Sequence, residues 1–235
     1  MNLKDKVAVV TGISKGIGNA LCLQLLAKGC RVYGLGRNSG NIEHANFTFI
    51  PCDIRKEDEV KTCIASILSK HPQIEILINN AGLGYFSFLE EMPSEQWHEM
   101  FDTNINGMFY CIKAVLPQMK TAQTGHIINI ASTAALEGMP QVSAYCATKW
   151  AVKGLSESLF REVRDFGIKV TCVYPGSTKT DFFRNAPGIK PHDYMLMPED
   201  VALGMIQALE MPDNFHTVNW EIRPLQVKGP KTNKG

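Results

Sequence analysis

The sequence predicts a single α/β domain of the doubly wound class, with a mostly parallel seven-stranded sheet and helices on both faces. Three observations favour this fold class. Short β-rich segments alternate with longer amphipathic segments along the whole chain. Most of the short segments are apolar throughout, as expected of strands buried on both faces. The chain has 235 residues, of which 45% are hydrophobic, and this is enough for one large core.

The elements follow from this alternation in chain order. The segments expected to form strands are 7–11, 31–35, 47–51, 74–79, 126–131, 169–174 and 218–222. The segments expected to form helices lie at about 17–28, 55–70, 95–120, 143–165 and 198–210. Because the stretch between Arg37 and Phe47 is so short, the second crossover is expected to carry a short or degenerate helix.

Composition excludes several classes of function. The 24 Lys and Arg residues nearly balance the 23 Asp and Glu residues, so no nucleic-acid partner is expected. The seven cysteines contain no Cys-x-x-Cys pair, and the six histidines have no metal-ligand spacing, so neither a metal nor a disulfide framework is expected. No apolar run approaches the roughly 20 residues of a membrane span. We therefore expect a cytoplasmic protein with reduced thiols and no membrane partner.

A glycine-rich turn follows the first predicted strand and opens the first predicted helix. It reads Thr11-Gly12-Ile13-Ser14-Lys15-Gly16-Ile17-Gly18. Glycines allow a tight turn and a close approach of the backbone, and a helix N-terminus offers free N–H groups to a pyrophosphate. A structural turn is the alternative, but the position at the first strand–helix junction favours a nucleotide.

The end of the second predicted strand indicates which nicotinamide cofactor is used. An acidic residue there would hold a ribose 2′-hydroxyl and repel a 2′-phosphate, whereas this chain reads Leu35-Gly36-Arg37. Arg37 can bind a phosphate with two hydrogen bonds, and Lys15 can add a second cation. The two cations favour NADP(H), unless both are merely solvated surface residues.

Three polar residues predict the chemistry. Tyr145 and Lys149 are four residues apart in a predicted helix and so lie on one face, and Ser132 ends a predicted strand where a ligand crevice is expected. Because a phenol has an ordinary pKa near 10, a neighbouring ammonium and an oxidised nicotinamide would favour its ionised form. Tyr145 is then a general acid or base, and Ser132 a hydrogen-bond donor to the substrate oxygen. Each residue also has a non-catalytic alternative. Ser132 could be a turn residue at the end of a strand, Tyr145 a packing aromatic and Lys149 a solvated cation.

These and further motifs resemble, in order and spacing over nearly the whole chain, the short-chain dehydrogenase/reductase family. The resemblance implies a Rossmann fold and a catalytic set of Asn104, Ser132, Tyr145 and Lys149, with Asn104 holding a water in a proton relay to the lysine. It also implies that Asp53 meets the adenine and that the segment from Pro175 to Thr180 meets the nicotinamide and pyrophosphate. The cofactor-binding residues expected are Gly12, Ser14, Lys15, Gly16, Ile17, Gly18, Arg37, Asp53, Ile54, Asn80, Ala81, Gly82, Tyr145, Lys149, Pro175, Gly176, Thr178 and Thr180.

The expected function is NADP(H)-dependent hydride transfer to or from a carbonyl or secondary alcohol. A non-catalytic nucleotide sensor or scaffold is a second hypothesis. A protein of that kind would have no chemical need for all four residues of the catalytic set, and this argues against it. A nucleotide-sugar epimerase or dehydratase is a third, and such enzymes usually need a larger C-terminal region than this chain has.

Two further expectations concern the substrate loop and the subunits. The segment of about 181–197 has the position and length of a substrate loop, with an apolar wall from residues such as Phe182, and about 226–235 read as a flexible tail. The stretch from Trp97 to Leu116 is apolar on more than one face, which suggests a second buried contact. Since the resemblance implies subunit contacts through this helix and the one bearing Tyr145, a homodimer or homotetramer is expected.

Overall fold

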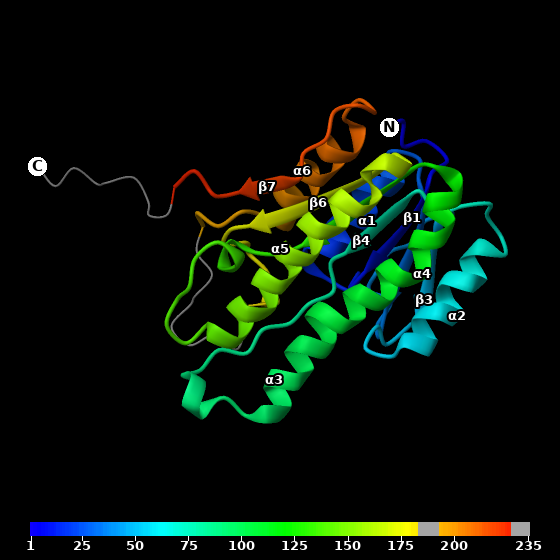
Figure 1. Cartoon of the computed structure of the whole chain (residues 1–235). Coiled ribbons are helices and arrows are strands. Elements are labelled where there is room, and N and C mark those ends of the chain that lie inside the picture. The colour runs from blue at the N-terminus through cyan, green and yellow to red at the C-terminus, as the bar shows by residue number, and fades with distance from the viewer. Residues whose placement is uncertain (183–192, 227–235) are drawn as a thin grey trace, which may run out of the picture.

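The computed structural model describes residues 1–182 and 193–226 and places seven strands in one sheet of order β3-β2-β1-β4-β5-β6-β7 (Figure 1). Every neighbouring pair is parallel, so the predicted mostly parallel sheet is parallel throughout. The strands are β1 (Val7–Thr11), β2 (Arg31–Gly36), β3 (Phe47–Pro51), β4 (Ile76–Asn79), β5 (Gly125–Ile130), β6 (Ile168–Pro175) and β7 (Asn219–Ile222). The strand order reverses between β1 and β4, and ligands of doubly wound sheets bind at such a point.

Helices cover both faces of the sheet, as predicted. Those described are α1 (Gly16–Ala27), α2 (Glu57–Leu68), α3 (Ser94–Phe101), α4 (Gly107–Ala122), α5 (Ser143–Val163) and α6 (Pro198–Glu210). In Figure 1, α2, α4 and α5 lie in front of the sheet, with α1 and α6 behind it. No helix in the described residues is both long enough and apolar enough to cross a membrane.

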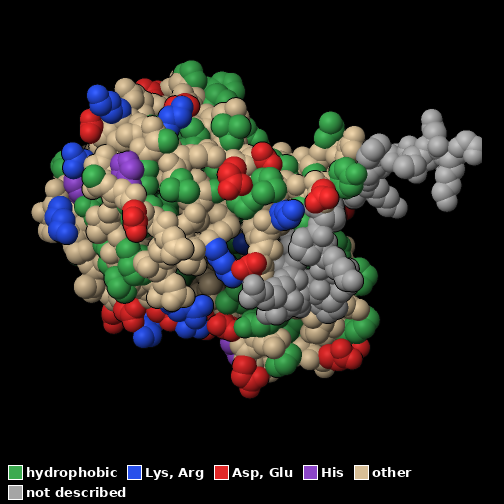
Figure 2. Space-filling model, turned by 180° about the vertical axis from the view of Figure 1, so that it is seen from behind, with side chains coloured by type: hydrophobic (Ala, Val, Ile, Leu, Met, Phe, Trp, Pro, Cys, Tyr) green, Lys and Arg blue, Asp and Glu red, His purple; other side chains and the backbone are tan. Residues whose placement is uncertain are grey.

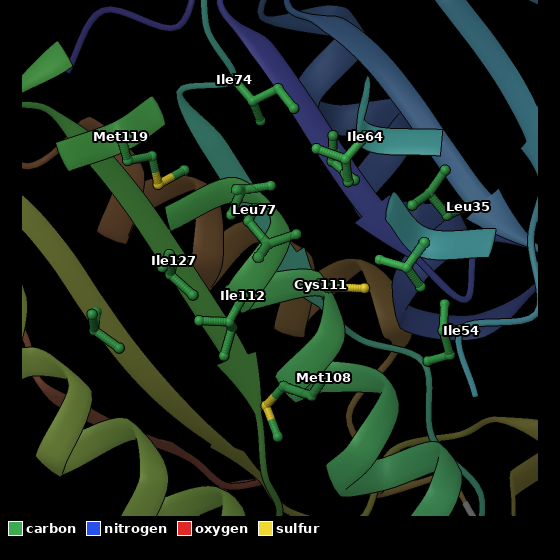
Figure 3. Packing of buried hydrophobic residues seen from close by; sticks show 14 of the residues in the cluster. Leu35, Ile54, Ile64, Ile74, Leu77, Met108, Cys111, Ile112, Met119 and Ile127 are labelled. Atoms are coloured by element: carbon green, nitrogen blue, oxygen red, sulfur yellow. The ribbon is translucent and has the colours of Figure 1, made fainter. Parts of the chain in front are cut away.

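The larger core cluster fills the space between the sheet and α2, α4 and α5. Figure 3 shows Leu77 and Ile127 of the sheet facing Met108 and Ile112 of α4, and all four side chains are buried. Burying one such side chain stabilises the fold by about 1.5–3 kcal/mol. A second cluster, between the other face of the sheet and α1 and α6, completes the two-layered core.

The edges of the sheet differ from its centre. Residues 37–46 between β2 and β3 contain no helix, in agreement with the shortened crossover that the sequence predicts. Strand β3 is only partly buried, because it lies at the edge of the sheet and no helix covers it from that connection. Strand β7, at the other edge, is also partly exposed. The strands between them are buried, because they have neighbours on both sides and helices on both faces.

The helix predicted at about 95–120 is interrupted by a π-helical turn at Asp102–Asn106, between α3 and α4. A π-turn contains one more residue than an α-turn, so it shifts the buried face by roughly 100°. Met100 and Trp97 of α3 therefore pack around Tyr145, whereas Met108 of α4 packs against the sheet. Much of the apolar excess in this stretch is thus intramolecular packing, although Phe109 remains 44% exposed.

Acidic and basic side chains are interspersed on the face of the molecule shown in Figure 2. This distribution agrees with the near-balance of charge in the sequence. A nucleic-acid backbone would instead call for a contiguous basic surface.

A buried histidine makes the stability of this fold sensitive to acid. The Nε2 atom of His126 lies 2.9 Å from Oγ1 of Thr171, whose hydroxyl donates to the carbonyl of Thr217. The Nε2 must therefore carry the ring proton, and Nδ1 is buried without a hydrogen-bond partner among the described residues. Burial, with smaller contributions from the positive charges of His216, Lys169 and the N-terminus, lowers the pKa of His126 well below its ordinary 6.5.

We expect the free energy of unfolding to fall as the pH drops through about 6.5, because the unfolded chain then binds a proton that folded His126 does not accept. His126 alone accounts for a loss of about 2 kcal/mol between about pH 7 and pH 5. Urea unfolding at a series of pH values measures this loss. His126→Gln should flatten the profile, whereas His98→Gln, at an exposed position of α3, should not. Identical profiles for the wild type and His126→Gln would contradict the argument.

Candidate active site

The glycine turn between β1 and α1 has no room for a side chain at Gly12 or Gly18. Gly12 has φ +72°, and a Cβ there would lie 2.7 Å from Cα of Ala81. A Cβ on Gly18 would lie 2.4 Å from both Nδ2 of Asn80 and the carbonyl oxygen of Gly12. The N-terminus of α1 has no side-chain cap, which leaves the first-turn N–H groups available to a pyrophosphate. The turn therefore fits a dinucleotide.

The end of β4 holds this turn in place. The side chain of Asn80 donates to the carbonyls of Thr11 and Gly12, both at 3.0 Å. The hydroxyl oxygen of Thr11 accepts from the backbone N–H groups of Asn80 and Ala81. Of the predicted cofactor-binding residues, Asn80 therefore supports the turn with its side chain.

The segment after β6 lies against the glycine turn. A Cβ on Gly16 would lie 3.2 Å from Cγ2 of Thr180, so this segment meets the glycine turn. Lys15 forms an exposed ion pair of 2.9 Å with Asp181. The side chain of Thr178, by contrast, is buried and donates to the carbonyl of Gly176, 2.9 Å away. Residues 183–192 of the predicted substrate loop, and residues 227–235 of the predicted tail, lie outside the described residues.

Asp53, which follows β3, is engaged by a neighbouring cation. Both carboxylate oxygens accept hydrogen bonds from the guanidinium of Arg55, at 2.6–3.1 Å. These bonds hold the pKa of Asp53 below its usual range. Arg55 also contacts Glu99 of α3, which accepts a 2.6 Å hydrogen bond from Tyr85. The side chain of Ile54 is buried against Gly107 at the start of α4.

Arg37 stands exposed where β2 ends. Its charge is near enough to contribute to the lowered pKa of Asp53. The loop that follows Arg37 packs against the glycine turn, since a Cβ on Gly40 would lie 3.1 Å from Cα of Ser14. The structure therefore brings the loops that carry Lys15 and Arg37 together.

The predicted pair of Ser132 and Tyr145 meets beyond the carboxyl end of β5. The Ser132 hydroxyl is near enough to the phenol of Tyr145 to lower the pKa of the phenol through side-chain hydrogen bonding. Burial has the larger and opposite effect, because Tyr145 is only 8% exposed, and the net result is a pKa raised well above 10. Among the protein's own groups, burial therefore outweighs the contacts that favour the ionised phenol, and Tyr145 holds its proton.

Lys149 is buried one helical turn from Tyr145. Its ammonium lies 5.6 Å from the centre of the Tyr145 ring and donates a 2.9 Å hydrogen bond to the carbonyl of Ile130. Burial lowers the pKa of Lys149 to about 8, so the ammonium form still predominates at neutral pH.

Asn104 lies in the π-helical turn, beside Lys149 and the end of β4. A Cβ on Gly82 would lie 3.3 Å from Oδ1 of Asn104 and 3.6 Å from Nζ of Lys149. The Asn104 side chain bonds both backbone groups of Leu83, at 2.9 Å each, and donates to the hydroxyl of Thr148 at 3.0 Å. The Asn104 side chain is thereby fixed on its neighbours.

Several residues of the site were absent from the sequence-based expectation. Thr148 lies inside the Tyr145–Lys149 motif and links Asn104 to the carbonyl of Tyr145 by hydrogen bonds of 3.0 and 2.8 Å. Its position in the motif was a usable signal. Arg55 and Glu99 gave none, because their pairing depends on how α3 packs against the end of β3.

Comparison with known proteins extends over most of this chain. A family model described as short chain dehydrogenase matches residues 6–188. An uncharacterized oxidoreductase of Staphylococcus saprophyticus is 38% identical, over 95% of this chain and 97% of its own length. An alcohol dehydrogenase from Thermococcus sibiricus, in complex with 5-hydroxy-NADP, superposes with a TM-score of 0.84 at 26% identity, covering 94% of this chain and 97% of its own. The closed form of a serine dehydrogenase in complex with NADP⁺ superposes with a TM-score of 0.86 at 27% identity, covering 95% and 97% of the two chains.

Proposed function

Since this chain belongs to the short-chain dehydrogenase family and is an oxidoreductase, we propose that it transfers a hydride between NADP(H) and a carbonyl or secondary alcohol. The observation that carries the proposal is the hydrogen-bonded pair of Ser132 and Tyr145, with the Lys149 ammonium 5.6 Å from the phenol ring. Tyr145 and Lys149 are buried and Ser132 is partly buried, and buried ionisable groups that converge at the carboxyl end of a parallel sheet favour a catalytic role.

In the reduction direction, Tyr145 acts as the acid. Its raised pKa keeps the phenol protonated, ready to give that proton to the carbonyl oxygen as the C=O bond becomes an alcohol. Ser132 donates a hydrogen bond to the same oxygen and stabilises the charge that develops there. When bound, the nicotinamide supplies the hydride to the carbonyl carbon, or accepts it in the reverse reaction. The Lys149 ammonium stabilises the phenolate that remains on Tyr145.

The glycine turn, the end of β4 and the segment after β6 would hold the cofactor. First-turn N–H groups at Gly16, Ile17 and Gly18 would bind the pyrophosphate, and the backbone near Asp53 and Ile54 would meet the adenine. Lys15 and Arg37 would bind the 2′-phosphate. Lys15 would then leave its ion pair with Asp181, and an exposed ion pair of this kind costs little to break.

The activity is tested by incubating the purified protein with NADPH and a panel of aldehydes and ketones. Loss of NADPH absorbance with at least one carbonyl compound, at a rate above that with NADH, is the expected result. Tight NADPH binding without turnover of any compound in either direction would instead favour the nucleotide-sensor hypothesis.

Arg37→Asp should weaken NADPH binding by about 10- to 100-fold while changing NADH binding much less, because it removes a charge-assisted phosphate contact and adds a repelling carboxylate. Nucleotide fluorescence titration measures both dissociation constants. Arg31→Asp is the matched control, since Arg31 is exposed at the other end of β2. Equal affinities of the wild type for NADPH and NADH would show the phosphate argument to be wrong.

We also propose a homodimer or homotetramer in the cytoplasm. Phe109 of α4 and Trp150 of α5 are 44% and 48% exposed, on the two helices that the family resemblance assigns to subunit contacts. The seven cysteines are all buried and free, as suits a reducing compartment. Light scattering should give a mass of at least two chains of 26.1 kDa, and a monomer at micromolar concentration would contradict the assembly.

A further inference from the structure

Three aromatic rings from distant segments converge beside the proposed proton donor. The ring centres of Tyr145 and Phe182 are 5.3 Å apart, those of Phe86 and Tyr145 are 5.7 Å apart, and those of Phe86 and Phe182 are 6.0 Å apart with edge-to-face geometry. Phe86 follows β4, Tyr145 lies in α5 and Phe182 follows β6. We call these three residues the aromatic cage.

Gly84 allows the cage to close. A Cβ at this position would lie 2.8 Å from Phe182, 3.0 Å from Phe86 and 3.2 Å from Tyr145. Contacts below 3.0 Å do not occur for real Cβ atoms, so the rings occupy the space that any side chain at residue 84 would need. The convergence therefore depends on the glycine and on ring packing together.

The surroundings of the cage are also apolar. Met100, Ala134, Ala144 and Cys146 are buried with Tyr145 in one cluster, against which Phe86 and Phe182 pack. Two further apolar side chains lie on the segments that lead to the cage and face solvent: Phe88, 48% exposed, and Met139, 44% exposed. Phe86 and Phe182 are themselves only partly buried, so their rings remain accessible.

From this geometry we infer that the substrate is an uncharged carbonyl compound that carries an aromatic ring, and that Phe86 and Phe182 determine this specificity by stacking on the ring. This inference rests on the proposed function. A flat apolar group gains offset-stacked or edge-to-face contacts with these rings, in the arrangement that aromatic pairs prefer. A carboxylate or a polyhydroxylated chain would lose its hydration against the same surface without gaining hydrogen bonds from it.

The test compares four carbonyl compounds in the NADPH absorbance assay: benzaldehyde and acetophenone, which carry an uncharged ring; 4-carboxybenzaldehyde, which adds a charge; and glyceraldehyde, which is polyhydroxylated. We expect kcat/KM for the two uncharged ring compounds to exceed that for the other two by at least about 10-fold. A preference for glyceraldehyde or for 4-carboxybenzaldehyde would overturn the inference while leaving the proposed function intact.

Variants of the cage locate the origin of the preference. Phe86→Ala and Phe182→Ala should each raise KM for acetophenone by about 10-fold, with a smaller effect on kcat. Each should also lower the ratio of kcat/KM for acetophenone to kcat/KM for glyceraldehyde. Phe86→Leu keeps the bulk but loses the ring, so it should show the same trend even where the alanine variant is poorly folded. Phe215→Ala, at an exposed ring that follows α6, is the matched control. An unchanged KM and selectivity in all three cage variants would refute the assignment.

A binding measurement separates this inference from the proposed function. Saturation-transfer NMR detects acetophenone on the NADPH-loaded protein without requiring turnover. Binding that is lost in Phe86→Leu, with no turnover of any compound, would support the cage and refute the hydride-transfer function. No detectable binding of either uncharged ring compound would refute the cage.

Discussion

Replacing Tyr145 with phenylalanine is expected to reduce kcat for carbonyl reduction by about 10²- to 10⁴-fold, the usual contribution of a positioned acid, while NADPH still binds. The variant keeps the ring that packs against Phe86 and Phe182 and loses only the hydroxyl that bonds Ser132. Stability should therefore change by only about 1 kcal/mol. Turnover is followed by NADPH absorbance and cofactor binding by NADPH fluorescence.

Tyr110→Phe is the matched control for this experiment. Tyr110 lies on α4 and packs against the core of the sheet, away from Ser132 and Lys149. Its loss of a hydroxyl should leave kcat within about twofold of the wild type. Turnover in Tyr145→Phe close to that of the wild type would remove Tyr145 from the mechanism.

Gly12→Ala is expected to destabilise the fold by at least about 2 kcal/mol and to weaken NADPH binding by at least about 10-fold. The residue has φ +72°, which an L side chain rarely adopts, and its Cβ would lie 2.7 Å from backbone Cα of Ala81. Because the obstacle is backbone, the glycine turn and the end of β4 must separate. Urea unfolding and fluorescence titration measure the two losses.

The control for this substitution is Gly138→Ala. Nothing lies within 4 Å of a Cβ at Gly138, and its φ is not positive. Its stability should stay within about 0.5 kcal/mol of the wild type. A Gly12→Ala protein as stable and as tightly binding as the control would show that the turn tolerates a side chain.

The parts of the molecule that depend on local pattern were predictable. Buried strands are recognisable in the sequence as apolar runs. The structure therefore confirmed the predicted sheet and nearly all of the predicted helices. Motif spacing likewise predicted that Ser132, Tyr145 and Lys149 would meet. These features follow from residues close in the sequence or from the rule that parallel strands end at one edge.

The remainder depends on tertiary environment. A helical pattern does not show a change of phase, so the π-turn around Asn104 was not foreseen. The raised pKa of Tyr145 results from burial in a cluster whose members, such as Met100, Phe86 and Phe182, come from distant segments of the chain. The hydrogen bonds from Arg55 to Asp53 likewise depend on tertiary packing, which the spacing of residues along the chain does not show.

The extra residue in the π-turn lets α3 and α4, which form one nearly continuous helix, pack against different parts of the protein. Upstream of it, Trp97 and Met100 pack around Tyr145, and downstream Met108 packs against the sheet. Mutations that adapt the enzyme to new molecules can therefore accumulate in α3 without loosening the packing of α4 against the sheet. Deleting that residue would rotate α3 relative to α4 about the helix axis. The residues that pack around Tyr145 and those that pack against the sheet would then have to lie on the same face of one continuous helix.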